Sequence, residues 1–310
     1  MIRYALRRMA GALPTLLILA ALTFFLLRFA PGGPFDSERA FPPEVQAAID
    51  AKYGLDQPLP IQFGRWLWDL LHSNLGESLQ YTGRPVTEIL AEAVPASLQL
   101  GILALLLSVA IGLPLGAIAA WKRNTWLDFS AVFITVAGVS LPSYLVASFL
   151  IMVFSLQLGW LPPALWEDWT SMILPVVTLS TRPLALIARI TRSSTLEALA
   201  SDYVRTAYSK GLSSLSVVFR HALRNSLIPV LTLLGPITAG LLTGSFLVEV
   251  VFQIPGLGRH FVNAVLNRDY PLVMGITLLY GVVLIAANLA VDLAYGWVDP
   301  RIRVDSQEHA

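Results

Sequence analysis

The chain has 310 residues, of which 55% are hydrophobic and 13% are charged, and its formal net charge is +1. Soluble domains carry about a quarter charged residues, so this composition excludes an ordinary soluble protein and indicates an integral membrane protein; the net charge gives no sign of a nucleic-acid partner. Because the chain has no cysteine and only four scattered histidines, we expect no disulfide, no thiol catalysis and no metal site.

The first predicted element is a membrane span within residues 1–30. Three arginines in the first eight residues precede an apolar run from Met9 to Leu27. A secretory signal peptide begins in a similar way, but its apolar core has only about 7–15 residues and ends at a small-residue cleavage site. Since this run is longer and residues 28–33 offer no such site, we expect an uncleaved first span.

The second element is a polar segment, residues 31–96, which has no apolar run long enough to cross a bilayer. Two helices are expected in it: Pro43 suits the first turn of a helix that runs to Tyr53, and another helix covers residues 61–72. This other helix carries four large apolar residues on one side, namely Phe63, Trp66, Leu67 and Leu70. We expect the segment to pack against the rest of the protein.

Five further apolar stretches each reach the roughly 20 residues that a bilayer demands. They cover residues 98–120, 129–158, 172–190, 227–251 and 272–298. The sequence thus predicts an all-α integral membrane protein with six transmembrane helices, five of them in a core of residues 97–310. Small residues four apart, as in the pairs Gly112/Gly116 and Gly240/Gly244, are expected to let helix backbones approach closely.

The basic residues predict how the chain is oriented, because cytoplasmic loops of membrane proteins carry an excess of lysine and arginine. The N-terminal arginines, Lys122, Arg123 and the basic residues between positions 189 and 224 all fall on one side of the predicted bilayer. Residues 31–96, on the other side, contain more acidic than basic residues. We therefore expect both termini in the cytoplasm and residues 31–96 outside.

A polar and basic interruption, residues 195–225, separates the fourth and fifth predicted spans. Each half has apolar residues one helical turn apart, as Tyr203 and Ala207 are, and Gly211 separates the halves as a left-handed residue at a helix end does. The pattern predicts two short helices that present a face to a soluble partner. An amphipathic helix lying on lipid is the alternative, but it calls for bulkier apolar residues than Val204 and Ala207.

Three residues within predicted spans are candidates for a translocation path or for helix pairing. Arg182 lies midway along the fourth span, where a charged side chain faces protein or water, and both roles fit it equally. Asn288 and Asp292, one turn apart in the sixth span, favour helix pairing. Because no second carboxylate is expected deep in a span, we do not expect a proton relay.

The sequence carries no motif for chemistry of its own. HExxH and GxxxxGK[ST] are absent and no histidine falls inside a predicted span, so neither an intramembrane protease nor a P-loop ATPase is indicated. A kinked helix bundle that has a docking loop but no energy source of its own implies that a separate protein supplies the energy.

Short motifs spread over the chain together indicate a family. In chain order they are RR at 7–8, PTL at 14–16, APGGPF at 30–35, PPE at 42–44, KYGL at 52–55, NLGES at 74–78, IPGLG at 254–258, NRDYPL at 267–272 and DPRIR at 299–303. With these motifs the chain resembles, along essentially its whole length, the permease subunits of bacterial ATP-binding-cassette (ABC) importers of the oligopeptide and dipeptide family. Within that family it is most like the first oligopeptide permease.

This resemblance implies a role for residues 195–225. The family has a coupling motif, of pattern EAAxxxG, that docks into a cleft of the ATPase subunit, and residues 205–211 are similar to it, with Arg205 in the place of the glutamate. The resemblance further implies that Ala207 is small in order to fit that cleft. The residues implied to take part in this coupling are Tyr203, Arg205, Thr206, Ala207, Lys210, Gly211, His221 and Arg224.

The resemblance also implies a fold and partners. The expected fold is that of a type I ABC importer permease, in the bacterial cytoplasmic (inner) membrane. The expected partners are a second homologous permease, two ATPase subunits that bind the ATP and magnesium, a peptide substrate, and an extracytoplasmic binding protein. From its position and size, the segment at residues 31–96 is expected to help receive that binding protein. The chain itself is expected to bind no cofactor and to be no enzyme. Another solute of the same family, a dipeptide or nickel, is the alternative; an ATPase-independent channel or membrane enzyme is a more distant one.

Overall fold

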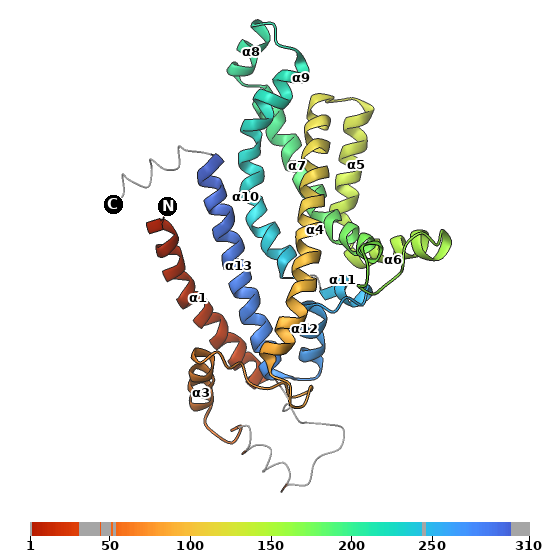
Figure 1. Ribbon diagram of the computed structural model, residues 1–310. Helices are drawn as coiled ribbons and strands as arrows, with labels where there is room; N and C mark the ends of the chain where they lie inside the picture. The colour runs from red at the N-terminus through yellow and green to blue at the C-terminus, as the bar shows by residue number, and fades with distance from the viewer. Residues whose placement is uncertain (1, 31–43, 45–50, 52–53, 244–245, 299–310) are drawn as a thin grey trace. The chain divides into compact units, whose positions relative to one another are not determined.

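The structure is a computed structural model that describes residues 2–30, 44, 51, 54–243 and 246–298 (Figure 1). For residues 2–7, 9 and 292–298 only the backbone is described. Every regular element of the described chain is a helix, as the predicted all-α class requires. The helix expected from Pro43 to Tyr53 lies almost wholly outside the described residues, and Gly244 and the motif at 299–303 lie outside them altogether.

The chain divides into two compact units, each of which we describe by itself. The first unit comprises residues 96–255 and 283–310 and contains α5 (Trp126–Ser140), α6 (Ser143–Leu150), η1 (Ile151–Gln157), α7 (Trp169–Leu199), α8 (Asp202–Ser209), α9 (Ser214–Ser216), η2 (Val217–Ala222), α10 (Leu223–Leu242) and α11 (Phe246–Val251). The second unit comprises residues 2–95 and 256–282 and contains α1 (Ile2–Phe29), α3 (Leu59–Leu71) and α12 (Leu257–Leu266). Two long helices, α4 (Val86–Trp121) and α13 (Tyr270–Val298), contribute residues to both units.

Five of the predicted spans are present as helical segments long and apolar enough to cross a membrane: Ala10–Phe29, Val86–Trp121, Trp169–Leu199, Ser214–Val251 and Tyr270–Val291. The remaining predicted span, over residues 129–158, is broken, because the chain bends there by 109° between α5 and α6. Pro142 causes the bend, since a proline disfavours the helical conformation in the residue before it, and Leu141 is extended with a ψ of 127°. The described chain has a sixth span if this bent pair counts as one.

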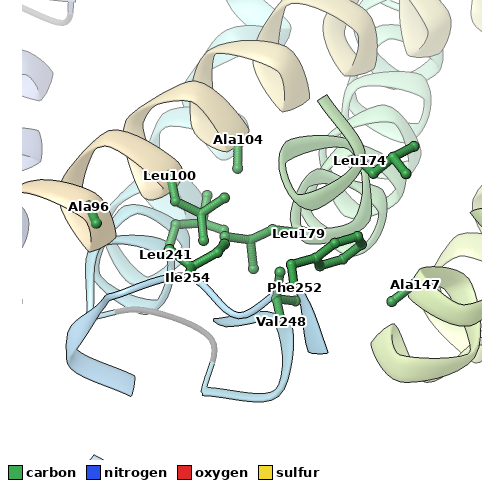
Figure 2. Packing of buried hydrophobic residues seen from close by; sticks show 10 residues of the cluster. All are labelled: Ala96, Leu100, Ala104, Ala147, Leu174, Leu179, Leu241, Val248, Phe252 and Ile254. Carbon is green, nitrogen blue, oxygen red and sulfur yellow. The ribbon is translucent and has the colours of Figure 1, made fainter. Parts of the chain in front are cut away.

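The core of the first unit joins α4, α7, α10 and α11. Leu100, Leu241 and Ile254 are each at most 4% exposed and belong to one cluster of buried apolar side chains, which Figure 2 shows. Burying aliphatic side chains of this size stabilises a fold by about 1.5–3 kcal/mol each relative to water. The cluster therefore fixes the helices on which the loop at residues 195–225 stands.

The predicted close packing at small residues is confirmed on α4 and is not found at Gly240 of α10, while Gly244 lies outside the described residues. A Cβ atom placed on Gly112 would lie 2.9 Å from the carbonyl oxygen of Leu184, and one on Gly116 would lie 2.4 Å from that of Ala188. Both glycines are therefore required for the contact between α4 and α7. A Cβ atom on Gly240 would meet no atom within 4 Å, so the spacing alone did not identify a contact there.

In the second unit, α3 packs against the end of α1. The ring of Phe63 lies 5.2 Å from that of Phe24 and 5.8 Å from that of Phe25, centroid to centroid. Arg28 Nε donates a hydrogen bond to Gln62 Oε1 at 2.9 Å. The prediction that the polar segment packs against the rest of the protein is thus confirmed for this helix.

A buried carboxylate, that of Asp269, organises another part of the second unit. It accepts a short hydrogen bond from the Ser78 hydroxyl and longer ones from the backbone N–H groups of Leu79 (3.2 Å), Gln80 (3.3 Å) and Leu272 (3.3 Å). Asp269 is fully buried, so these donors replace the water that a carboxylate otherwise needs. Two of the sequence motifs, NLGES and NRDYPL, therefore meet at one internal hydrogen-bond network.

Candidate coupling surface

The loop at residues 195–225 stands at one end of α7 and α10 (Figure 1). Its first helix, α8, ends as predicted at Gly211, which has a φ of +76°. The Gly211 N–H donates to the carbonyl of Tyr208 at 2.9 Å, and the Leu212 N–H donates to that of Ala207 at 3.3 Å. This pair of bonds around a left-handed glycine is the Schellman arrangement that closes many helices.

A small apolar core holds α8 in place. Val204 and Ala207 are 1% and 7% exposed and pack in one cluster with Val217 and Ala222; we call these four residues the loop core. The buried stripe of α8 therefore runs through Val204 rather than through Tyr203. The chain's own packing already requires a small residue at Ala207, and the expectation that it is small in order to fit a partner's cleft stays a prediction.

The second half of the loop differs from the two-helix prediction. α9 begins after Ser213, whose hydroxyl accepts the N–H of Ser216 at 3.4 Å, and the backbone then stays helical at Val217 and Leu223. α9, η2 and α10 therefore follow one another without a break. The second half is the start of the fifth span rather than a separate surface helix, because no glycine or proline interrupts it before Pro229.

The outer side of the loop is aromatic and basic. Tyr203 and Tyr208 are 41% and 44% exposed. We call the following exposed residues of the loop the loop surface: Tyr203, Arg205, Thr206, Tyr208, Lys210, Leu212, Leu215, Phe219 and Arg220. Within it, Arg205 pairs with exposed Asp202 at 3.4 Å. Tyrosine and arginine are enriched in protein–protein interfaces, so this surface suits a protein partner. Of the other predicted coupling residues, Gly211 and Arg224 are exposed and His221 is half-buried.

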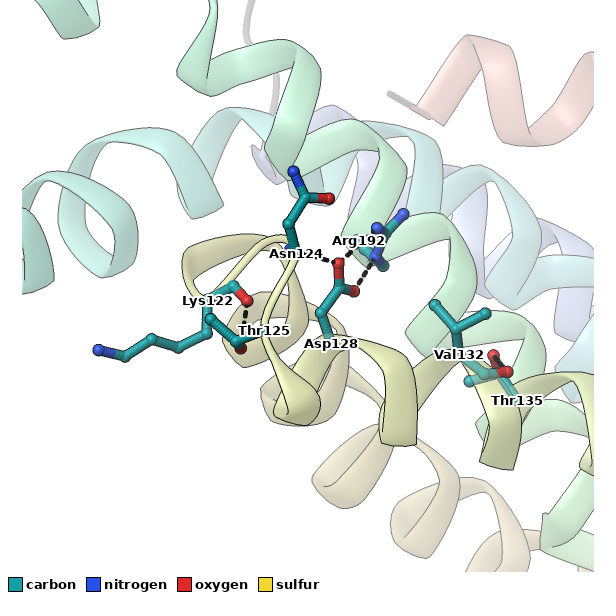
Figure 3. Close-up of polar contacts among 7 residues, drawn as sticks. All are labelled: Lys122, Asn124, Thr125, Asp128, Val132, Thr135 and Arg192. Atoms are coloured by element: carbon teal, nitrogen blue, oxygen red, sulfur yellow. Dashed lines mark hydrogen bonds and ion pairs between the residues drawn. The ribbon is translucent and has the colours of Figure 1, made fainter.

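An ion pair that sequence reasoning missed lies close to the base of the loop (Figure 3). Arg192 on α7 donates from Nε and Nη2 to the two carboxylate oxygens of Asp128 on α5, at 2.6 and 2.9 Å. The backbone N–H of Asn124 donates to the same carboxylate at 3.0 Å. The Asp128 side chain is only 3% exposed. In the sequence, Asp128 is visible only as a single acidic residue at the start of an apolar run. The cation that pairs with it could be identified only from the fold.

Two further contacts fasten the loop to its surroundings. Thr195 on α7 and Ser226 on α10 hydrogen-bond through their hydroxyls at 3.0 Å, and both are buried. Trp121, the last residue of α4, donates from Nε1 to the hydroxyl of Ser214 at 3.0 Å, and its ring meets that of Phe219 edge to face at 6.4 Å. The loop thus contacts α4, α7 and α10 by side chains.

The structure does not bring the candidate residues inside the spans together into one site. Arg182 is exposed on α7 and forms no ion pair with a described residue, so it does not pair helices within the described chain. Asn288 on α13 is half-buried, and its Oδ1 would lie 3.0 Å from a Cβ atom on Gly235 of α10. Asn288 therefore packs where these two helices meet. The side chain of Asp292 lies outside the description.

A carboxylate that sequence reasoning missed is that of Glu249 on α11, within the predicted fifth span. Glu249 is fully buried and accepts a hydrogen bond from the Ser97 hydroxyl of α4 at 2.9 Å. It lies two residues before the end of the predicted span, whereas the expectation concerned carboxylates deep in a span. Among the described residues, no group of three or more His, Asp or Glu side chains could hold a metal ion.

Comparison with known proteins gives matches over nearly the whole chain. Residues 112–304 match the family model described as "Binding-protein-dependent transport system inner membrane component", and residues 1–100 match the related N-terminal model. The chain is 46% identical to the oligopeptide transport system permease protein OppB of Salmonella typhimurium, over 98% of this chain and 100% of that protein. It is 43% identical to the dipeptide transport system permease protein DppB of Bacillus subtilis, over 98% and 99%.

A solved structure shares the fold. It is a chain of the MetNI methionine ABC transporter in an inward-facing conformation, with a TM-score of 0.56 and 18% identity, covering 69% of this chain and 97% of that chain. At this identity the likeness concerns the fold alone.

Proposed function

This chain belongs to the family of inner membrane components of binding-protein-dependent transport systems, with the fold of a type I ABC importer permease, and from that premise we propose that its cargo is a peptide. The observation that carries the proposal is the 46% identity, over 98% of this chain and 100% of the relative, to an oligopeptide permease. We place oligopeptides first among the substrates, and the dipeptide permease at 43% identity makes dipeptides the second candidate. The membrane is proposed to be the bacterial cytoplasmic membrane, with both termini in the cytoplasm.

We further propose that the energy comes from two separate ATPase subunits, which hold the ATP and magnesium. Support comes from the absence of a P-loop motif in this chain and from the loop surface, an exposed aromatic and basic face on a short capped helix. When the ATPases close on ATP, they would displace the loop surface, and the loop core would carry the displacement to α7 and α10. Tyr203, Arg205, Thr206 and Lys210 are the proposed contacts, and His221 and Arg224 flank them on the next helix.

The importer is proposed to contain a second homologous permease and an extracytoplasmic peptide-binding protein. The polar segment at residues 31–96 is the proposed receiving surface for the binding protein, because it is the longest part of the chain outside the predicted spans. Arg182, exposed on α7, is the proposed residue of the translocation path. Peptide then crosses the membrane by alternating access, in which the helices that carry the loop change their tilt.

Reconstitution tests the proposal directly. Proteoliposomes that contain both permeases and both ATPases, supplied with the binding protein, are expected to accumulate labelled peptides only with ATP, and peptides of several residues faster than dipeptides. Nickel is the control solute and is expected not to accumulate. Accumulation of solute by this chain without ATPases would overturn the proposal in favour of a channel, and ATP-driven uptake of nickel but not of peptide would overturn the substrate.

A further inference from the structure

The contacts near the base of the loop extend to two helices that the loop does not itself connect. α7 and α10 are joined by the loop, but α7 also carries Arg192, whose guanidinium holds the Asp128 carboxylate of α5 by two bonds of 2.6 and 2.9 Å (Figure 3). Paired charge-assisted bonds of this kind are short and directional. Since the Asp128 side chain is 3% exposed, water does not replace Arg192 without cost.

The turn between α4 and α5 is fastened at a second point. Trp121 Nε1 donates to the Ser214 hydroxyl at 3.0 Å, and the Trp121 ring contacts Phe219 edge to face. Both partners lie on the helix that leads from the loop into α10. The turn from Trp121 to Asp128 is therefore bonded to both arms of the loop, to α7 by an ion pair and to α9 and η2 by an indole.

Backbone packing leaves little freedom for these helices to slide. A Cβ atom on Gly116 of α4 would lie 2.4 Å from the carbonyl oxygen of Ala188 on α7, and one on Gly138 of α5 would lie 2.9 Å from the Cβ of Ala185. Packed interfaces of this kind shift between discrete arrangements rather than deform continuously. α4 and α5 thus meet α7 both along their length and at the polar contacts near the loop.

We infer that the α4–α5 turn is a second coupling element, through which displacement of the loop surface moves α4 and α5 together with α7 and α10. Asp128, Arg192 and Trp121 are positioning residues in this inference: they contact neither peptide nor nucleotide but hold four helices as one body. The inference rests on the proposed function, because it requires a partner that displaces the loop. It extends the proposed coupling from two helices that move with the loop, α7 and α10, to four.

The first test measures coupling rather than activity alone. In the reconstituted importer at matched permease content, Asp128→Asn and Arg192→Gln are expected to lower the number of peptides imported per ATP hydrolysed by at least about fivefold, the lower end of typical coupling effects. Asp168→Asn is the matched control: Asp168 caps the opposite end of α7 by accepting the Ser171 N–H at 2.8 Å, and its loss is expected to leave the ratio unchanged. If the two variants only reduce the amount of permease in the membrane and leave the import-to-ATP ratio unchanged, the ion pair is merely structural and the inference is overturned.

A second test uses the wild-type contacts, so it does not depend on whether those variants fold. Because the chain has no cysteine, spin labels can be placed on exposed Ser130 of α5 and exposed Glu197 of α7. The distance between them is expected to be the same in the nucleotide-free and the ATP-trapped importer. A distance that changes between the two states would show that α5 does not move with α7 and would defeat the inference.

The indole contact provides a milder variant pair. Trp121→Phe removes the donor to Ser214 and keeps an aromatic ring, whereas Trp126→Phe makes the same change at a residue that is 72% exposed on the same turn. Trp121→Phe is expected to lower the import-to-ATP ratio and Trp126→Phe to leave it unchanged. Equal ratios for the two variants would contradict the inferred role of the α4–α5 turn in coupling. If instead the wild-type importer shows no ATP-driven uptake at all, the proposed function fails and not this inference.

Discussion

The helix α8 and the segment that follows α3, residues 74–81, both carry motifs of the family, but different forces hold them in place. α8 rests on the loop core, four small apolar side chains, and is closed by one left-handed glycine. The segment at 74–81 is held by the fully buried Asp269 carboxylate, which accepts a hydroxyl and two backbone N–H groups from it. Hydrogen bonds to a charged group contribute about 1.5–3 kcal/mol each and are directional, whereas apolar packing is not directional.

The difference shows why a motif does not by itself mark a surface. In the Asp269 network, Ser78 and Asp269 satisfy each other inside the protein and are 3% and 0% exposed. In α8, only Val204 and Ala207 are used internally, and Tyr203 and Tyr208 remain exposed. Burial therefore divides the motif residues into those that build the fold and those that a partner can contact.

The largest expected effect concerns the side of the membrane on which each region lies. A cysteine in place of exposed Gln80 should react with a membrane-impermeant maleimide in intact cells, and a cysteine in place of exposed Ser209 should react only after permeabilisation. Ser78 is unsuitable for this purpose because it is buried and bonded to Asp269. The cysteine-free wild-type chain gives the background. The reverse pattern of labelling would invert the proposed orientation.

The next effect is on stability, at the Asp269 network. Asp269→Ala leaves the Ser78 hydroxyl and three backbone N–H groups without their acceptor, and each buried donor left unsatisfied costs about 1–3 kcal/mol. We expect the free energy of unfolding to fall by at least about 3 kcal/mol, seen as a large drop in the Tm of the purified protein and in its membrane content. Glu77→Ala, at an exposed neighbour, is the control. An unchanged Tm for Asp269→Ala would contradict the network's role.

A third prediction separates the inner side of α8 from its outer side. Ala207→Glu inserts a larger, charged side chain into the loop core, where overpacking alone costs about 1–3 kcal/mol and an unpaired buried charge adds to this. Tyr203→Glu changes only the loop surface. We expect trypsin to cut the isolated permease at Arg205 or Lys210 faster in Ala207→Glu and at the wild-type rate in Tyr203→Glu.

The same two variants differ in how they affect the ATPases. Both should lose peptide uptake, Ala207→Glu because α8 no longer keeps its shape and Tyr203→Glu because the ATPases no longer bind in a pull-down. If Ala207→Glu resists trypsin like the wild type yet still loses ATPase binding, the alanine contacts the partner after all, and the loop core is not what keeps it small.

The helix that ends at Gly211 could be predicted from the sequence because its signal is local. A glycine at a break in helical spacing indicates a left-handed end wherever the helix lies. The buried stripe could not be predicted, because Ala207 pairs equally well with Tyr203 four residues before it or with Val204 three residues before it. Only contact with Val217 and Ala222, which come later in the chain, decides between the two.

The spans show the same division between local and distant causes. Their existence follows from composition, and Pro142 marks where the helix breaks, but the proline alone does not predict the angle of 109° between α5 and α6. The pair of Asp128 and Arg192 joins positions 64 residues apart. Sequence patterns do not show such a contact, because each residue alone is equally well explained by exposure at a membrane surface.

A fourth, smaller effect tests the end of α8. A Cβ atom on Gly211 would meet nothing within 4 Å, so space does not limit substitution there, whereas its φ of +76° does. A side chain in this conformation costs roughly 1–2 kcal/mol, and asparagine tolerates it better than alanine or valine. We expect peptide uptake at matched membrane levels to fall in the order Gly, Asn, Ala, Val. Higher uptake for alanine than for asparagine would show that size, and hence partner approach, governs this position.

The smallest expected effect is a pH dependence of stability, caused by His260 beside the Asp269 network. The His260 ring lies 6.0 Å from that of Tyr81, whose backbone N–H donates to the Ser78 hydroxyl. Burial, together with repulsion from Arg259 and Arg84, lowers the pKa of His260 below its ordinary value of 6.5, and Glu92 opposes this only weakly.

Since the unfolded chain then binds a proton more readily than the folded one, the contribution of His260 to stability is fully present above pH 6.5 and decreases as the pH falls below it. We therefore expect the Tm of the wild type to drop between about pH 7.5 and about pH 5.5 by more than that of His260→Gln, whose side chain does not titrate. His72→Gln, at an exposed histidine, is the control and should keep the full drop. An equal drop in His260→Gln would mean that the half-buried ring accepts its proton without disturbing the segment that Ser78 and Asp269 hold.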